Sequence, residues 1–243
     1  MSHAAGILVG LLFAAEFFLV AQALRFTSAA HTVVLLYTAP IFVALGLHWK
    51  LPSERLSLIQ WLGIACAFFG IVIAFLFPPA VSQAAASSAL WGDVLALLAG
   101  VLWAATTIAV RLTKLAEAPA TQTLFYQLFI AFLVLFPVAF FMGQATIHWS
   151  VLSLTSLLFH TVVVSFASYL IWFWLLKKYL ASQLGVFSFL TPIFGMCFGV
   201  VLLNEQLELN FLVGTCFVLM GVVAVSLHHK IKQYAQAFKV ALQ

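Results

Sequence analysis

The chain carries very little charge. Its 243 residues include 10 lysines and arginines and 6 aspartates and glutamates, so only 7% are charged while 65% are hydrophobic. A water-soluble domain covers about a quarter to a third of its surface with charged side chains, which this composition cannot supply. The shortage of charge therefore excludes an ordinary soluble domain.

Cysteines and catalytic motifs are also scarce. Cys66, Cys197 and Cys216 are odd in number and lie within apolar stretches. We expect free thiols that pack as small apolar side chains, and no disulfide or metal site. The sequence has no Walker-type glycine loop, no zinc-binding His-Glu pair and no nucleophile elbow. We therefore expect a non-enzymatic protein with no catalytic residues, no cofactor and no metal.

Long apolar stretches are abundant instead. Each is close to the about 20 residues that a helix needs to cross the hydrocarbon core of a bilayer. A transmembrane barrel would show segments of about 10 residues with alternating polarity. The sequence predicts an all-α fold, a polytopic bundle of eight transmembrane helices. The stretches cover residues 6–24, 29–48, 57–77, 90–110, 121–142, 151–175, 181–203 and 209–227.

The basic residues predict the orientation of this bundle. With the N-terminus inside, Arg25 alone faces outward and the other nine basic residues face inward. The nine are Lys50, Arg55, Arg111, Lys114, Lys177, Lys178, Lys230, Lys232 and Lys239. The positive-inside rule then predicts a cell-membrane protein, such as one of the bacterial inner membrane, with both termini in the cytoplasm. The net charge of +4 thus reflects orientation and not nucleic-acid binding. The basic tail at 228–243 either lies on the anionic inner leaflet or is solvated.

Two parts of the chain repeat each other. The segment Tyr37-Thr-Ala-Pro-Ile-Phe42 matches Phe189-Leu-Thr-Pro-Ile-Phe194, and a glutamate and two glycines follow each segment in the same order. These residues are Glu54, Gly63 and Gly70 in the first copy and Glu205, Gly214 and Gly221 in the second. An odd number of helix steps separates the copies, so they cross the membrane in opposite directions. Such inverted repeats are typical of secondary transporters. The paired glycines, and Gly195 with Gly199, predict close helix contacts.

The order of these motifs resembles the EamA-type repeat of the drug/metabolite transporter superfamily. The resemblance also includes Glu54-Arg-Leu-Ser57 and, at the opening of the second copy, Trp91-Gly-Asp93 and Leu102-Trp-Ala104; it runs from about residue 6 to 227. It implies ten helices, five per repeat, and transport of small metabolites or drugs. Here the second repeat, 90–227, has five helices, and the first, 1–77, has three.

The first repeat has two helices fewer than the second, and this difference predicts a longer form of the protein. We expect the segment 78–89 to be a plain linker between the repeats. We also expect a ten-helix form with roughly 50–60 further N-terminal residues that contain two apolar stretches. If the chain works at its present length, a partner chain or a homodimer must close the open side.

Glu16 is the strongest candidate for a functional residue. A carboxylate in the middle of a span costs about 2.5–3.5 kcal/mol against lipid on insertion scales. It could couple transport to a proton or cation, balance a cationic substrate, or be a protonated group bonded to a neighbouring helix. We also place His160, Tyr169 and Trp103 in the substrate or ion path. The alternatives are a backbone-bonded histidine for His160 and interface anchoring for Tyr169.

Prolines within the predicted spans and acidic residues near helix ends are further candidates for structural or functional roles. Pro40 and Pro192 occupy matching positions in two spans and predict either a hinge pair or two passive kinks. Asp93, Glu54 and Glu205 precede or open helices, so we expect each to cap its own following helix, assisted in the latter two cases by Ser57 and Asn210. The alternative for Asp93 is a contact with the substrate. Arg25 either pairs with an acidic group in the loop bearing Glu205 and Glu208 or is free in water.

These features favour an integral membrane secondary transporter in a lipid bilayer. We expect an exporter of small metabolites, amino acids or drugs, driven by an ion gradient or by facilitated diffusion. The alternative is a membrane enzyme or a structural subunit without transport activity. An enzyme needs clustered catalytic groups, and Glu16 and His160 alone do not form such a cluster.

Overall fold

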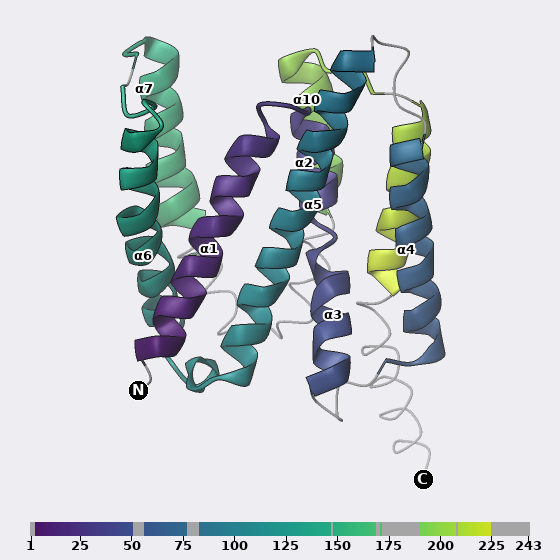
Figure 1. Ribbon diagram of the computed structural model, residues 1–243, viewed down its shortest axis with the longest axis horizontal. Helices are drawn as coiled ribbons and strands as arrows, with labels where there is room; N and C mark the ends of the chain where they lie inside the picture. The colour runs from purple at the N-terminus through teal and green to yellow at the C-terminus, as the bar shows by residue number, and fades with distance from the viewer. Residues whose placement is uncertain are drawn as a thin grey trace.

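The computed structural model describes residues 3–50, 56–76, 83–146, 148–168, 171, 190–207 and 209–224. All regular structure within these ranges is helical (Figure 1), which confirms the all-α prediction. Each of the eight predicted apolar segments contains a helix. The elements are α1 (His3–Ala23), α2 (Ala29–Leu36), α3 (Ala39–Lys50), α4 (Leu58–Leu76), α5 (Gln83–Leu112), the 3₁₀-helix η2 (Lys114–Ala116), α6 (Ala120–Phe141), α7 (Val151–Leu158), the π-helix η3 (Phe159–Ser168), α10 (Leu190–Leu203) and the helix Leu209–Ala224.

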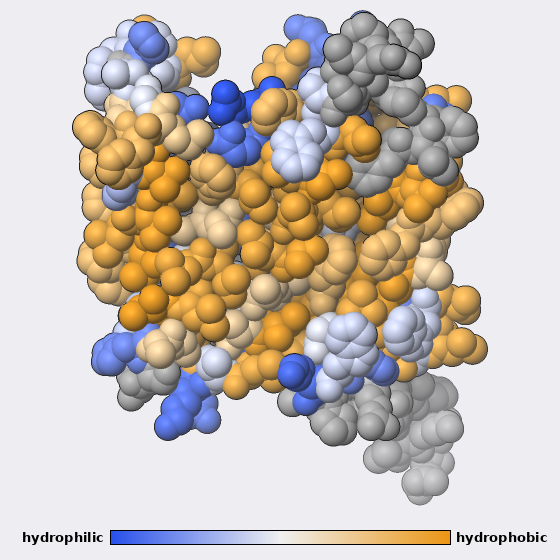
Figure 2. Space-filling model, in the orientation of Figure 1, coloured by the Kyte–Doolittle hydropathy of each residue, from blue (hydrophilic) through white to orange (hydrophobic). Residues whose placement is uncertain are grey.

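The lengths and surface of these helices are those of a membrane protein. Within the described ranges, four helical segments are long and apolar enough to cross a bilayer: His3–Ala23, Ala29–Lys50, Ser88–Leu112 and Thr121–Phe141. Four shorter apolar helices accompany them. Figure 2 shows a broad hydrophobic zone across the middle of the visible face and hydrophilic residues near its two ends. This distribution matches a hydrocarbon layer between two aqueous phases, and the fold is a transmembrane helix bundle.

Helix α5 organises the centre of the bundle. It packs against α1, α2 and α3, while α6 packs on the other side of α1 and α10 packs against α2 (Figure 1). The main core lies between α2, α3, α4, α5 and the helix Leu209–Ala224. Its most deeply buried members include Leu35, Ile41 and Phe211. Residues from the two halves of the chain therefore share one core.

The helix Leu209–Ala224 crosses α4 at the paired glycines. A Cβ atom on Gly70 would collide with the backbone carbonyl of Gly214, and one on Gly221 would collide with the carbonyl of Gly63. The earlier glycine of each helix thus meets the later glycine of the other, which requires the two helices to be antiparallel. The predicted close contact is confirmed, and the antiparallel arrangement is the one expected of equivalent helices in inverted repeats.

The three cysteines are free thiols, as predicted. Cys66 lies at the same crossing, and its Sγ donates to the carbonyl of Phe217 at 3.5 Å. Ser57 also behaves as predicted. It caps α4 by accepting from the backbone N–H of Gln60, whose side chain accepts in return from the N–H of Ser57.

Three elements differ from the sequence-based boundaries. The span predicted as one helix at 29–48 is divided into α2 and α3. Helix α5 begins at Gln83, so part of the expected linker is helical, because its run of alanines favours a helix more than its small residues favour a loop. The span at 151–175 begins as α7 and continues from Phe159 as the π-helix η3.

Candidate functional site at the break between α2 and α3

The break between α2 and α3 exposes backbone polar groups inside the membrane span. Pro40 has no N–H, so the carbonyl of Leu36, four residues earlier, loses its usual helical donor. The hydroxyl of Thr38 donates to the carbonyl of Leu35 at 2.6 Å, and the N–H of Thr38 donates to the same oxygen at 3.2 Å. Pro40 and Thr38 together therefore end α2 at Leu36.

Helix α5 approaches this break closely. A Cβ atom on Gly100 would lie only 3.0 Å from the carbonyl oxygen of Leu36 and 3.1 Å from that of Leu35. The absence of a side chain at Gly100 lets the two backbones meet. Interrupted helices whose free carbonyls face a neighbouring element are a recurrent way to build substrate and ion sites in transporters.

Aromatic and hydroxyl side chains gather at the same level. Tyr37, at the end of α2, meets Trp103 of α5 edge to face, with ring centroids 5.1 Å apart. The hydroxyl of Tyr37 is hydrogen-bonded to the side chain of Thr191 in α10. Three helices thus contribute to one group of side chains, and Trp103, a predicted site residue, is a member of it.

Glu16 of α1 joins this group through Tyr37. The two side chains are close enough to interact electrostatically. Glu16 is only 6% exposed, and within the described part of the chain its Oε2 atom has no hydrogen-bond partner. A carboxylate in that position carries an uncompensated charge in a low-dielectric region, which is unfavourable unless a proton or a cation neutralises it. We call Glu16, Tyr37, Trp103 and Thr191 the central site.

The two candidate hinge prolines lie next to the central site. Pro40 is in the first turn of α3, directly after the break, and Pro192 follows Thr191 near the start of α10 as described. The side chain of Pro192 is fully buried. The residues immediately before α10 lie outside the described ranges, so only the break at Pro40 can be described.

The remaining predicted path residues are not brought to this site. His160 lies in η3, is exposed, and donates from Nδ1 to the carbonyl of Ser156 in its own helix at 2.9 Å. This geometry matches the alternative in which the backbone satisfies a lone histidine. Tyr169 lies outside the described residues. Sequence reasoning missed Tyr37 and Thr191, although both lie within the repeated proline motif that pointed to this region.

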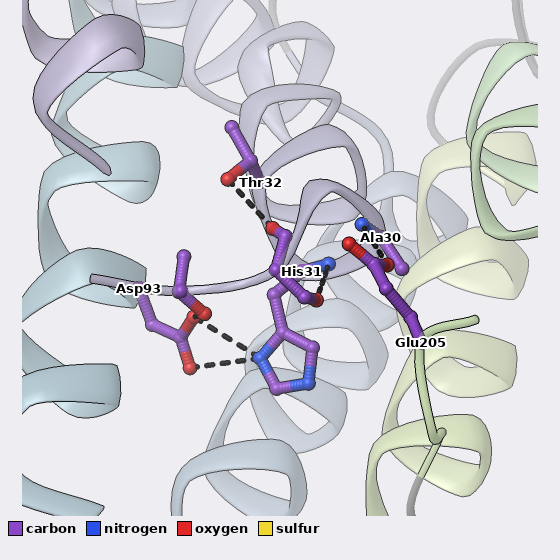
Figure 3. A network of polar contacts seen from close by, with 7 residues as sticks. Ala30, His31, Thr32, Asp93 and Glu205 are labelled. Atoms are coloured by element: carbon purple, nitrogen blue, oxygen red, sulfur yellow. Dashed lines mark hydrogen bonds and ion pairs between the residues drawn. The ribbon is translucent and has the colours of Figure 1, made fainter. Parts of the chain in front are cut away.

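A second polar group holds the opposite end of α2, and we call it the α2 clasp: Thr27, Ser28, His31, Asp93 and Glu205. Nδ1 of His31 donates to both carboxylate oxygens of Asp93 at 3.0 Å, and the hydroxyl of Thr27 donates to Asp93 at 2.5 Å. Ser28 caps α2 by accepting from the N–H of His31. Figure 3 shows this network, with the ring of His31 directed toward Asp93 and with Glu205, on the other side of His31, bound to Ala30.

The clasp corrects two predictions about caps. Asp93 does not cap a helix start, because α5 begins at Gln83 and Asp93 lies well inside it. Glu205 does not cap the helix that follows it, because its carboxylate accepts from the N–H groups of Ala29 and Ala30 in α2. Glu54, predicted to cap its own following helix, lies outside the described residues.

Arg25 lies beside the clasp without joining it. It donates to Gln22 at 3.0 Å and forms no ion pair with any acidic residue in the described part of the chain. Arg25 therefore does not pair with Glu205, whose carboxylate is bound to α2. The other acidic residue of that loop, Glu208, lies outside the described residues.

The comparisons with known proteins agree on one family. The EamA-like transporter family matches residues 3–76 and 90–227. The chain is similar to the uncharacterized transporter YoaV of Bacillus subtilis, at 26% identity over 82% of this chain and 67% of that protein. It is also similar to an uncharacterized transporter of Archaeoglobus fulgidus, at 26% identity over 88% of this chain and 71% of that protein.

A further relative is the uncharacterized transporter YvbV of Bacillus subtilis, at 25% identity over 82% of this chain and 65% of that protein. No solved structure matches significantly. The family match extends over both halves of the chain and includes every helix of the central site and of the α2 clasp. The chain belongs to the EamA-like transporter family.

Proposed function

We propose that the protein is a secondary transporter of the cell membrane that exports a small metabolite, an amino acid or a drug. Both termini lie in the cytoplasm, and an ion gradient drives transport, with facilitated diffusion as the alternative. The family supports the general class, and the nine-to-one distribution of basic residues supports the orientation. Membership of a transporter family argues against the alternative of a membrane enzyme.

We infer that residues 1–77 and 90–227 form two inverted repeats, with the substrate path between them. The antiparallel crossing at the paired glycines supports this arrangement. The central site supports this position of the path, because both repeats contribute to it. Glu16 and Tyr37 come from the first repeat, and Trp103 and Thr191 come from the second. Polar groups from both repeats would then face the substrate.

The buried Oε2 atom of Glu16, which has no hydrogen-bond partner among the described residues, is the observation on which the coupling mechanism rests. In this mechanism the group alternates between a neutral form that carries a proton and a form neutralised by a coupling cation or a cationic substrate. Because Glu16 interacts electrostatically with Tyr37 at the break between α2 and α3, a change in the charge of Glu16 is felt at the interrupted helix. Coupling needs such a link between an ion and a movable element.

Reconstituted transport tests this role. The full chain is placed in proteoliposomes with an internal pH-sensitive dye, and a proton gradient is imposed. The common amino acids and ethidium are then screened one at a time as probes. We expect proton movement that depends on at least one added compound. Glu16→Gln and Glu16→Leu should reduce the coupled flux at least about tenfold, which corresponds to ~1.4 kcal/mol.

Glu117→Gln is the matched control, because Glu117 is exposed in the loop after η2 and lies outside the central site. It should leave the flux unchanged. Unchanged coupled transport in both Glu16 variants, in protein that is folded and inserted normally, would show that Glu16 has no coupling role.

A further inference from the structure

Glu205 connects two distant parts of the chain through a helix terminus. Its Oε1 accepts from the N–H of Ala29 at 2.7 Å, and its Oε2 accepts from the N–H of Ala30 at 3.0 Å. The first N–H groups of a helix have no partner within that helix. A carboxylate there makes charge-assisted hydrogen bonds and lies at the positive end of the helix dipole.

The local backbone directs Glu205 toward α2. Asn204 has φ of +53°, and the N–H of Glu205 donates to the carbonyl of Gly199 at 3.1 Å. Asparagine thus takes, directly after α10, the left-handed position that most residues avoid. A Cβ atom on Gly199 would collide with Oε2 of Glu205. The end of α10 is thus shaped to hold this carboxylate against α2.

Two other elements hold the same end of α2. Asp93 of α5 binds both Thr27 and His31, and the ring of His31 stacks on Phe211 with centroids 3.7 Å apart and planes inclined by 8°. Phe211 belongs to the helix Leu209–Ala224, and Glu205 follows α10. The α2 clasp and Phe211 therefore join α2 to α5, to the end of α10 and to the helix Leu209–Ala224.

The clasp lies at an end of the bundle where water can reach its partners. Arg25, Asn204 and Gln206, which flank it, are exposed, whereas Val34 in the next turn of α2 is buried. If the clasp separated, water could bind both the carboxylate of Glu205 and the N–H groups of α2. The contact can therefore break at moderate cost, unlike a polar contact deep in the hydrocarbon region.

We propose that Glu205 is a latch that closes this end of the bundle, and that its release from α2 opens a path from this face toward the central site. The contact joins elements of the two halves, which move relative to each other in inverted-repeat transporters. The structure is then the state closed on the clasp side. This inference uses the membership of a transporter family and does not depend on the coupling role of Glu16.

Accessibility of a single reporter thiol tests the latch without any substrate. In the full chain with Cys66, Cys197 and Cys216 replaced by alanine, Val34→Cys places a thiol one turn beyond the clasp. Sealed vesicles of both orientations are treated with a membrane-impermeant maleimide. We expect Glu205→Ala to increase the labelling rate about tenfold and Glu205→Gln about threefold, since the amide keeps only one acceptor oxygen.

The increase should occur only in vesicles whose outer surface carries the clasp. In the proposed topology residues 24–28 face outward, so these are the right-side-out vesicles. Glu117→Gln, an exposed glutamate at the other end of α5, should label like the parent protein. Equal labelling of the Glu205 variants and the parent would overturn the latch. So would faster labelling from both sides together with a lowered unfolding temperature, because that pattern indicates a purely structural contact.

Discussion

Two acidic residues, Asp93 and Glu205, act through partners far away in the sequence. Asp93 binds Thr27 and His31, and Glu205 binds the backbone of α2. Sequence patterns could identify these carboxylates as helix-end groups, but they could not identify the helix that each one serves. A local capping rule considers only the next few residues, whereas here the tertiary fold supplies the donors.

Neutralising Asp93 should weaken the bundle measurably. In Asp93→Asn the neutral amide has only one acceptor oxygen for the two donors, Thr27 and His31. We expect the free energy of unfolding to fall by about 1–3 kcal/mol. The measurement is thermal unfolding in detergent, followed by the circular dichroism of the helices. The exposed Glu117→Gln exchange serves for comparison and should leave the midpoint unchanged. An unshifted midpoint in Asp93→Asn would mean that the pair with His31 contributes little.

The central site was predictable in part. Glu16 stands out because a carboxylate is rare in the middle of an apolar span, and Trp103 belongs to a recognisable family motif. Tyr37 and Thr191 carry no such signal, because tyrosine and threonine are common in membrane helices and acquire a role only from their neighbours. Their proximity depends on how α2, α5 and α10 pack, which no local pattern specifies.

At the level of elements, glycine spacing was more informative than helix length. Two glycines two turns apart correctly predicted a close helix contact, which the structure forms where α4 crosses the helix Leu209–Ala224. Length and hydropathy alone predicted one continuous helix at 29–48, where the structure has a break. Proline made a kink foreseeable, but the full interruption also needs the hydroxyl of Thr38, bonded to Leu35, and the close approach of Gly100.

Filling the glycine crossing should destabilise the protein. Gly70→Val places a branched side chain against the carbonyl of Gly214, and we expect a loss of about 1–3 kcal/mol from overpacking. Gly221→Val should cost a similar amount, because it meets the equivalent contact on the other helix. Thermal unfolding in detergent measures both losses.

Ala65→Val is the matched comparison for these variants, because Ala65 is exposed on the same helix α4. It adds similar bulk toward the lipid and should change the midpoint little. If all three variants unfolded at the temperature of the parent protein, the crossing would not be tight in the membrane-embedded protein.

For the whole molecule, composition alone determined the class. A chain with 65% hydrophobic residues in long runs has no option other than helices in a bilayer, and the structure has a helix in every predicted span. Hydropathy requires only that each segment be buried in lipid or protein, so it constrains the number of spans. It does not determine which helices are neighbours, and the position of α1 between α5 and α6 had no counterpart in the sequence analysis.

Reporter fusions test the proposed orientation. A reporter active only outside the cytoplasm, inserted after Gly143, should give signal because the loop after α6 faces outward in the proposed topology. The same reporter inserted after Glu117 should be inactive, because that loop lies near Arg111 and Lys114 on the inner side. Signal at Glu117 and none at Gly143 would reverse the topology.

The stacking of His31 on Phe211 has a magnetic consequence. Protons held above the face of an aromatic ring resonate at lower frequency than the same protons in water. With centroids 3.7 Å apart and planes nearly parallel, the imidazole protons of His31 lie in that region of Phe211. In protein with labelled histidine, the His31 signal should therefore stand apart from those of the other six histidines, and Phe211→Leu should move it back among them.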